Sequence, residues 1–331
     1  MVPSILAHET WFTSERPPYD WSFALAGASL LLIGAAVAVA AAWRVVGRRL
    51  PRPELPFLRP LGALSPWVPR LLAIHAGVSL LAQAARATYL APALHLPDGP
   101  MGAGLRILEG VLGVWLISGF RIRWAAFAVV ASGPLGMPWY GVVPILERMD
   151  LLGIALFLSL LPPGPDRWGA APTAPAAVGP AVVALRMLVG GALVVLAFTE
   201  KLARPELALA FLDRFPAFNL LRTLGLDVGD VAFVRIAGAV ELLFGLLLIS
   251  GTLPQLAVIA AGIPFNATLF FLGAQELIGH LPIYGAMLAL LVYGSDRRLA
   301  PVVDAFPRPG ARRAVGDRSP APAAAGDRVP R

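Results

Sequence analysis

Residues 21–46 read WSFALAGASLLLIGAAVAVAAAWRVV, an apolar run with a single charged residue, Arg44. An α-helix of this length can cross the hydrocarbon core of a bilayer, which is about 30 Å thick. The segment before the run lacks the positively charged region of a signal peptide. We therefore expect the run to stay in the mature protein as a transmembrane helix.

Eight further apolar runs follow, at residues 68–90, 102–119, 122–138, 148–162, 178–199, 230–251, 254–274 and 277–294. Of the 331 residues, 57% are hydrophobic and 14% are charged, whereas about 25% are charged in an ordinary soluble chain. The sequence therefore predicts an all-α, polytopic integral membrane protein with about nine transmembrane helices, and the lipid bilayer as its main partner.

Several function classes are excluded by what the chain lacks. It has no Cys, which excludes disulfides, thiolate catalysis, iron–sulfur clusters and covalent c-type haem attachment. It has no Walker A loop, dinucleotide fingerprint, zinc-protease helix motif or nucleophile elbow, so nucleotide chemistry and hydrolysis have no support. The net charge of +7 comes almost wholly from Arg and does not by itself indicate nucleic-acid binding.

The distribution of Arg predicts the orientation, because cytoplasmic loops retain positive charge. The loop after the first run carries six Arg between residues 44 and 70, which places it inside and the N-terminus outside. Nine spans then bring the basic C-terminal tail to the cytoplasm, and we expect an inner (plasma) membrane location. Residues 200–229 are the exception, since they are assigned outside although they hold four basic residues.

Composition divides the chain into six parts. These are an outer N-terminal segment (1–21), the first transmembrane helix with its basic cytoplasmic loop (22–67), a four-helix module (68–162), a linker rich in Pro and Ala (163–180), a second four-helix module (181–295) and a basic tail expected to be disordered (296–331).

The two modules show an internal repeat. Glu109, Gly113, Ile117, Ser118 and Gly119 match Glu241, Gly245, Ile249, Ser250 and Gly251, each at an offset of 132 residues. Because each module has four spans, an even number, the copies must share one orientation, which makes this a parallel repeat. Chance similarity between apolar helices is the alternative. The first module has no His that matches His280, so we interpret it as the degenerate copy.

Residues 181–294 resemble the DoxX-like family, which includes the DoxD-like subunit of thiosulfate:quinone oxidoreductase. The similarity rests on Arg186, the stretch FTEKL ending at Leu202, the triplet VEL at 240–242, and the run from Glu276 through His280 and Tyr284 to Gly285. The resemblance implies a small helical membrane bundle, often a subunit of a redox complex that handles quinone or sulfur species. It therefore implies quinone as a cofactor and a partner redox subunit.

Glu241 lies about halfway along its expected helix. A carboxylate at this depth is costly and should face the bundle interior. It is either a proton acceptor for a quinone headgroup or an interhelical clamp. Lys201, the sole Lys in the chain, is its most attractive partner. With Tyr284, these two residues are our candidates for binding the cofactor.

Glu276 and His280 are four residues apart, so on a helix they share a face. His titrates near neutrality, which suits proton exchange with a quinol, whereas the structural alternative is an ion pair at a helix end. We assign Glu241, His280, Glu276 and Lys201 as candidate catalytic residues.

Two other groups of polar residues were weighed. His8, His95 and His280 are all placed on the outer side, where convergence would permit a copper or zinc site, but solvated loop residues are the simpler interpretation and no metal site is predicted. Arg106 and Glu109, three residues apart, are expected to form an ion pair within one helix.

These patterns favour a quinone-linked redox subunit of a membrane complex, with its polar site in the second module. The alternative is a non-catalytic scaffold or carrier for small apolar or lipid-like molecules, in which the same polar residues only lock the bundle.

Overall fold

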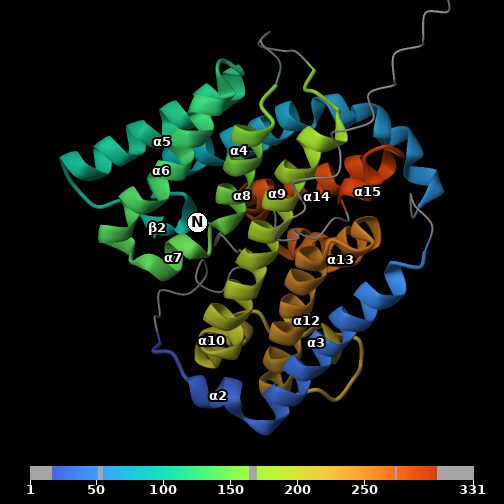
Figure 1. Ribbon diagram of the computed structural model, residues 1–331. Helices are drawn as coiled ribbons and strands as arrows, with labels where there is room; N and C mark the ends of the chain where they lie inside the picture. Colours follow the sequence, from blue (N-terminus) through green and yellow to red (C-terminus); the bar gives the residue numbers. More distant parts are fainter. Residues whose placement is uncertain (1–16, 51–54, 164–169, 273, 304–331) are drawn as a thin grey trace, which may run out of the picture.

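The computed structural model describes residues 17–50, 55–163, 170–272 and 274–303 (Figure 1). The N-terminal half contains α2 (Trp21–Leu25), α3 (Gly27–Gly47), η1 (Pro56–Trp67), α4 (Val68–Ala85), α5 (Pro100–Ser118), α6 (Ile122–Tyr140), α7 (Val142–Leu146) and α8 (Met149–Leu160). The C-terminal half contains α9 (Pro175–Leu196), η2 (Ala197–Leu202), α10 (Pro205–Arg214), η3 (Pro216–Phe218), α11 (Leu220–Thr223), α12 (Asp230–Ser250), α13 (Pro254–Leu272), α14 (Ala274–Ser295) and α15 (Ala300–Val303). A short antiparallel ribbon of β1 (Thr88–Tyr89) and β2 (Ala91–His95) joins α4 to α5.

The helical membrane architecture predicted from the sequence is confirmed. Within the described residues, six helical segments are long and apolar enough to cross a bilayer: Gly27–Gly47, Pro56–Ala85, Pro100–Ser118, Pro175–Leu202, Asp230–Ser250 and Leu277–Ser295. The other three apolar runs, 122–138, 148–162 and 254–274, form α6, α8 and α13 but are not among the six.

Helices α5 and α12 end in the same way. Each closes on a Gly in the left-handed region, Gly119 at φ 78° and Gly251 at φ 67°, a conformation that a glycine adopts without a Cβ penalty. Two residues later, Arg121 and Leu253 also have positive φ, at 45° and 49°. These paired turns send α6 and α13 back along the bundle.

A buried arginine binds the carbonyls at each of these helix ends. Arg70 of α4 donates to the carbonyls of Leu116 and Ile117, and Arg186 of α9 donates to those of Leu248 and Ile249. The last carbonyls of a helix lack partners within the helix and carry its negative dipole end. The two guanidinium groups therefore stabilise the C-terminal ends of α5 and α12.

Glycines bring the helices of two pairs into backbone contact. A Cβ built on Gly77 of α4 would lie 2.7 Å from the carbonyl oxygen of Gly113 on α5. A Cβ on Gly190 of α9 would lie 2.6 Å from that of Gly245 on α12. A larger residue at any of these four positions would force the two backbones apart.

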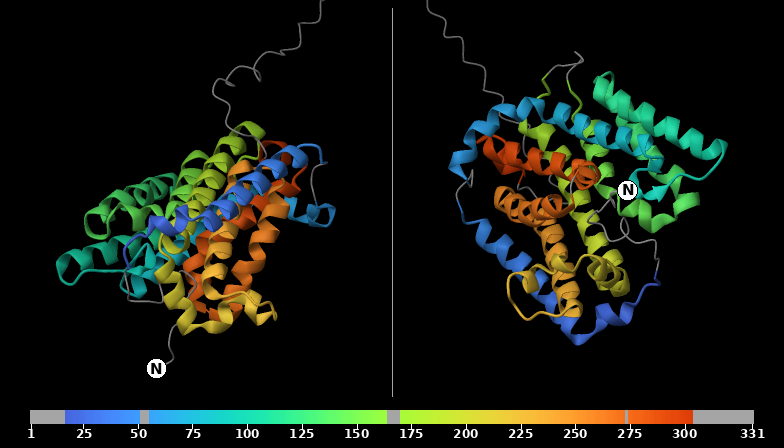
Figure 2. Two further views of the ribbon diagram at one scale, coloured as in Figure 1. Left: turned by 90° about the horizontal axis from the view of Figure 1, so that it is seen from below. Right: turned by 180° about the vertical axis from the view of Figure 1, so that it is seen from behind.

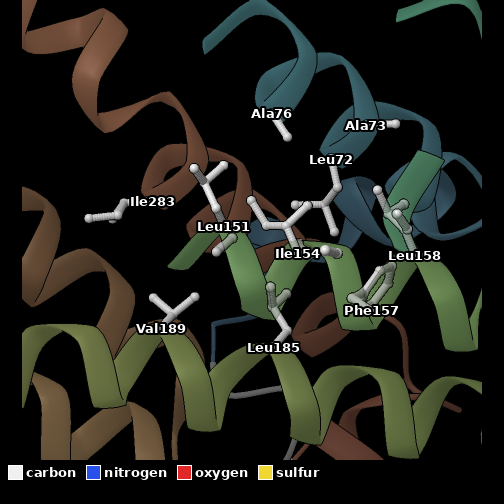
Figure 3. Close-up of a cluster of buried hydrophobic side chains, with 14 of the residues drawn as sticks. Leu72, Ala73, Ala76, Leu151, Ile154, Phe157, Leu158, Leu185, Val189 and Ile283 are labelled. Atoms are coloured by element: carbon white, nitrogen blue, oxygen red, sulfur yellow. The ribbon is translucent and has the colours of Figure 1, made fainter. Parts of the chain in front are cut away.

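The two halves also interlock across their seam, because α8 packs on α9 and α14 packs on α4. A Cβ on Gly153 of α8 would meet Leu188 of α9 at 3.1 Å, and one on Gly285 of α14 would meet His75 of α4 at 3.0 Å. Figure 3 shows Leu151 and Ile154 of α8 at the centre of this seam. Side chains from α4, α9 and α14 surround them.

Helix α3 lies along α12 and is fastened at both ends (Figures 1 and 2). At one end, the Arg235 guanidinium donates to the Ser29 hydroxyl at 3.2 Å and lies over the Phe23 ring. At the other end, Arg44 and Trp43 donate to the carbonyls of Ser250 and Thr252 at 2.5 and 2.7 Å. Arg235 and Arg44 therefore hold α3 against α12.

Three details differ from the sequence-based expectations. Residues 56–67, expected as part of a cytoplasmic loop, form the 3₁₀ segment η1, which packs on α14. The tail begins with α15, whose Val303 is fully buried; residues 304–331 lie outside the described part. The prediction of an ion pair between Arg106 and Glu109 was wrong, because each side chain binds a backbone group.

Arg106 and Glu109 instead bind backbone groups of the connection between α4 and α5. Arg106 Nε donates to the carbonyl of Ala84 at 2.7 Å, and Glu109 Oε1 accepts the N–H of Leu90 at 2.6 Å. The Ala84 carbonyl lies in the last turn of α4 and Leu90 lies in the turn of the ribbon, so the two side chains fasten both ends of this connection.

Candidate functional site

A cavity of about 290 Å³ opens in the C-terminal half, between α9, α12, α13 and α14. Its wall is mainly apolar and includes Leu193, Phe233, Val240, Phe244 and Ile283. Four polar side chains also line it: Glu200, Lys201, Glu241 and His280. Three of the four predicted catalytic residues therefore share one cavity.

The ion pair expected between Lys201 and Glu241 is confirmed. Lys201 Nζ lies 3.0 Å from Glu241 Oε2, and the two side chains are 14% and 20% exposed. Glu241 projects from the middle of α12, whereas Lys201 comes from η2, where the end of α9 widens into a π-helix. Such π segments are frequent at functional sites.

His280 lies on α14 and is only 3% exposed. Its ring meets that of Phe265 edge to face, with the centroids 5.2 Å apart. His280 therefore brings an imidazole into the wall of the cavity that also holds the Lys201–Glu241 ion pair.

Two predicted site residues lie elsewhere. Tyr284 is one helical turn from His280, donates to the Phe265 carbonyl at 3.1 Å, and lines a neighbouring groove instead of the cavity. The side chain of Glu276 lies outside the described part of the structure.

The histidines weighed as metal ligands are separated. His95 lies on the exposed end of β2, in the first half, and His280 lies in the cavity of the second. His8 lies outside the described residues. In the part of the chain that the structure describes, no group of three or more His, Asp or Glu is arranged to hold a metal ion.

Glu200 is the cavity residue that the sequence did not single out. It is 1% exposed, and it reaches the cavity from the same π segment as Lys201. Two consecutive residues of a regular helix point about 100° apart, so the sequence alone did not indicate that both would face one cavity. The adjacency of two charged residues at the end of an apolar run was the available signal.

A second carboxylate approaches Glu200 from the first half of the chain. Glu147 caps the C-terminus of α7, outside the helices long enough to span a membrane. Burial and the nearby charge of Glu200 raise the pKa of Glu147 to about 7, against the opposing influence of Thr199, Arg204 and Arg148. A carboxyl group with this pKa exchanges its proton near neutral pH.

The segment between α10 and α12 covers part of the cavity. Leu220 and Leu221 of α11 line the cavity. The buried Asn219 holds this segment in place, because its Nδ2 donates to the carbonyl of Val228 and to Asp230 Oδ1, both at 2.9 Å. We call residues 215–229 the cap.

The corresponding region of the first half is built differently. Glu109, 132 residues before Glu241, is 1% exposed and binds the Leu90 N–H instead of a Lys. Tyr89 is fully buried beside it, and its hydroxyl donates to the Ser132 carbonyl at 2.6 Å. The ribbon joins α4 to α5, whereas η2, α10 and the cap join α9 to α12.

Comparison with protein-family models, curated proteins and solved structures finds no match to this chain. The candidate site therefore stands on its own residues and geometry, and membership of the DoxX-like family stays a prediction.

Proposed function

We propose that the cavity binds the headgroup of a membrane quinone and that the chain is the quinone-binding subunit of a membrane redox complex. The observation that carries the proposal is the Lys201–Glu241 ion pair with His280 in an otherwise apolar cavity. Ligand sites are typically apolar clefts of roughly 300–1,000 Å³ with a few convergent polar groups. At about 290 Å³, this cavity suits one small ring system.

The residues fit the chemistry of such a headgroup. A quinone takes up two electrons and two protons at its two carbonyl oxygens. The Lys201 ammonium is suited to donate a hydrogen bond to one of these oxygens, since Lys carries three donors and no acceptor. His280 and Glu241 are the groups that can hold or release a proton at the cavity wall.

The electrons must come from elsewhere. Since the chain has no Cys, it provides no thiolate ligand for an iron–sulfur cluster. We therefore propose a partner redox subunit that carries the electron donor.

The apolar wall and the cap favour one other function, a carrier or scaffold for small lipid-like molecules. In that case, Lys201 and Glu241 only clamp η2 to α12, and a neutral hydrogen-bonding side chain should replace Glu241 without loss. Proton transfer, by contrast, requires a group that ionises.

The experiment compares wild type with Glu241→Gln, His280→Gln and the matched control Glu206→Gln, which lies on the exposed face of α10. Membranes from a strain lacking the gene are complemented with each variant, and the rate of quinone reduction is measured. We expect loss of at least about tenfold for the two cavity variants, the scale of a lost proton-transfer group. Unchanged rates in both variants, where the gene deletion lowers the rate, would exclude the cavity as the site of quinone reduction.

We further propose that the chain is a tandem repeat of two four-helix modules after α3, with nine spans and an outer N-terminus. Equivalent contacts support it at the 132-residue offset. Arg123 donates to the Ser159 carbonyl at 3.0 Å, and Gln255 to that of Leu291 at 3.4 Å. The glycine ends Gly119 and Gly251, and the close-packed Gly113 and Gly245, keep the same offset, whereas Gly77 on α4 and Gly190 on α9 are 113 residues apart. In this topology the cavity, α2 and α10 lie toward the outer side.

A further inference from the structure

A second hollow lies beside the cavity, between α13 and α14, which run side by side (Figure 1). This groove has a volume of about 470 Å³. Its lining is apolar apart from Asn266 and the Tyr284 hydroxyl, and it includes Gly262, Ile263, Met287 and Leu288.

The groove faces the exterior of the bundle. Ile263 on its edge is 70% exposed and Ile259 is 41% exposed. On a chain whose helices span a bilayer, an apolar exterior of this kind faces the acyl chains.

Phe265 and two consecutive residues of α14 separate the groove from the cavity. Phe265 lines the cavity and touches His280, while the Phe265 carbonyl accepts the hydroxyl of Tyr284, which lines the groove. Ile283 of the cavity and Tyr284 of the groove are consecutive on α14. The groove therefore lies next to the His280 wall of the cavity, on the other side of Phe265.

The geometry points to a tail site: we propose that the groove binds the isoprenoid tail of a long-chain quinone whose ring occupies the cavity. This inference rests on the proposed function and specifies its substrate class, a tailed quinone instead of a small soluble one. The four polar side chains of the cavity match the carbonyl oxygens of the ring, and the apolar groove matches the tail.

Gly262 offers a direct test. A Cβ built there meets only Asn266 Nδ2, at 3.7 Å, an ordinary van der Waals contact. Gly262→Leu should therefore fold and place its side chain in the groove. The matched control is Gly34→Leu on α3, where a Cβ would have no atom within 4 Å.

The assay uses the purified chain in lipid nanodiscs, with dissociation constants expressed as mole fraction in the bilayer. The probes are menadione, a naphthoquinone ring without a tail, and menaquinone, a naphthoquinone with a long isoprenoid tail; tailless and tailed ubiquinone form a second pair. We expect Gly262→Leu to weaken binding of the tailed member about tenfold and to leave binding of the tailless ring unchanged. Gly34→Leu should change neither.

Three results would overturn the tail site: equal affinity of wild type for tailed and tailless quinones, unchanged tailed binding in Gly262→Leu, or equal weakening of both probes. Either of the first two results would mean that bulk lipid, and not a quinone tail, occupies the groove. Failure of wild type to bind either quinone pair would instead refute the proposed function itself, so the two failures are distinguishable.

Discussion

Removing the charge of either Lys201 or Glu241 should destabilise the protein more than removing both. The two charges lie 3.0 Å apart, and at an effective dielectric constant of about 20 their attraction is roughly 5–6 kcal/mol. Desolvation of the two groups offsets most of this attraction. We expect a net coupling of about 1–3 kcal/mol, below the full value for buried pairs because both side chains are partly exposed.

A double-mutant cycle measures this coupling. Lys201→Met, Glu241→Gln and the double variant are unfolded by SDS titration in mixed micelles, and the free energies of unfolding are compared. Lys201→Met should cost the most, about 2–4 kcal/mol, because it leaves a carboxylate in an apolar wall without its ammonium. The double variant should recover part of that loss.

The pair Arg222–Asp230, whose side chains are 44% and 30% exposed, provides the control cycle. Its coupling should stay below about 0.5 kcal/mol, as is usual for surface pairs. A coupling for Lys201–Glu241 no larger than this control value would refute the claim that the cavity holds a strongly interacting ion pair.

Three further predictions concern packing, protonation and the cap. Gly245→Ala should lower the free energy of unfolding by about 1–3 kcal/mol by overpacking, since its Cβ would lie 2.7 Å from the Gly190 carbonyl oxygen. The control Gly104→Ala, whose Cβ would have no atom within 4 Å, should leave the free energy of unfolding unchanged. Equal unfolding curves for the two variants would contradict the close approach of α9 and α12. Because the pKa of Glu147 is raised from 4.5 to about 7, the folded state holds a proton that the unfolded state releases, so wild type should lose stability relative to Glu147→Gln between about pH 4.5 and 7, by up to about 3 kcal/mol. A pH-independent difference would refute the raised pKa. Asn219→Ala should lower the free energy of unfolding by about 1–3 kcal/mol and speed proteolysis within the cap. Substitution of the exposed Asp227 by Ala should do neither. Equal cleavage rates in the two variants would show that Asn219 does not fasten the cap.

The helices were predictable because an apolar run of membrane length leaves the backbone few alternatives. The ends of the helices were less predictable. The run at 68–90 was expected to be one helix, but α4 stops at Ala85, and Ala87 and Leu90 adopt positive φ to form the ribbon. Hydropathy carries no information about such a turn. The segment η1 was missed for the opposite reason, since its Pro residues and Arg59 resemble a loop.

The candidate site was partly predictable. Charged residues are rare inside apolar helices, so Glu241 and Lys201 stood out, and their pairing followed from charge alone. Glu200 and the groove were not predictable. The first depends on a π segment, and the second depends on how α13 and α14 meet around Gly262, which becomes visible only when two helices are placed together.

The quinone content of the purified protein is the most direct measurement of the central claim. Wild type, Glu241→Gln and the exposed control Glu206→Gln are purified in mild detergent, and their extracted lipids are analysed by mass spectrometry. Quinone should copurify near one molecule per chain with wild type and with Glu206→Gln, and should fall at least about tenfold in Glu241→Gln. Wild type without quinone, or equal quinone in all three proteins, would contradict a quinone site at Lys201, Glu241 and His280.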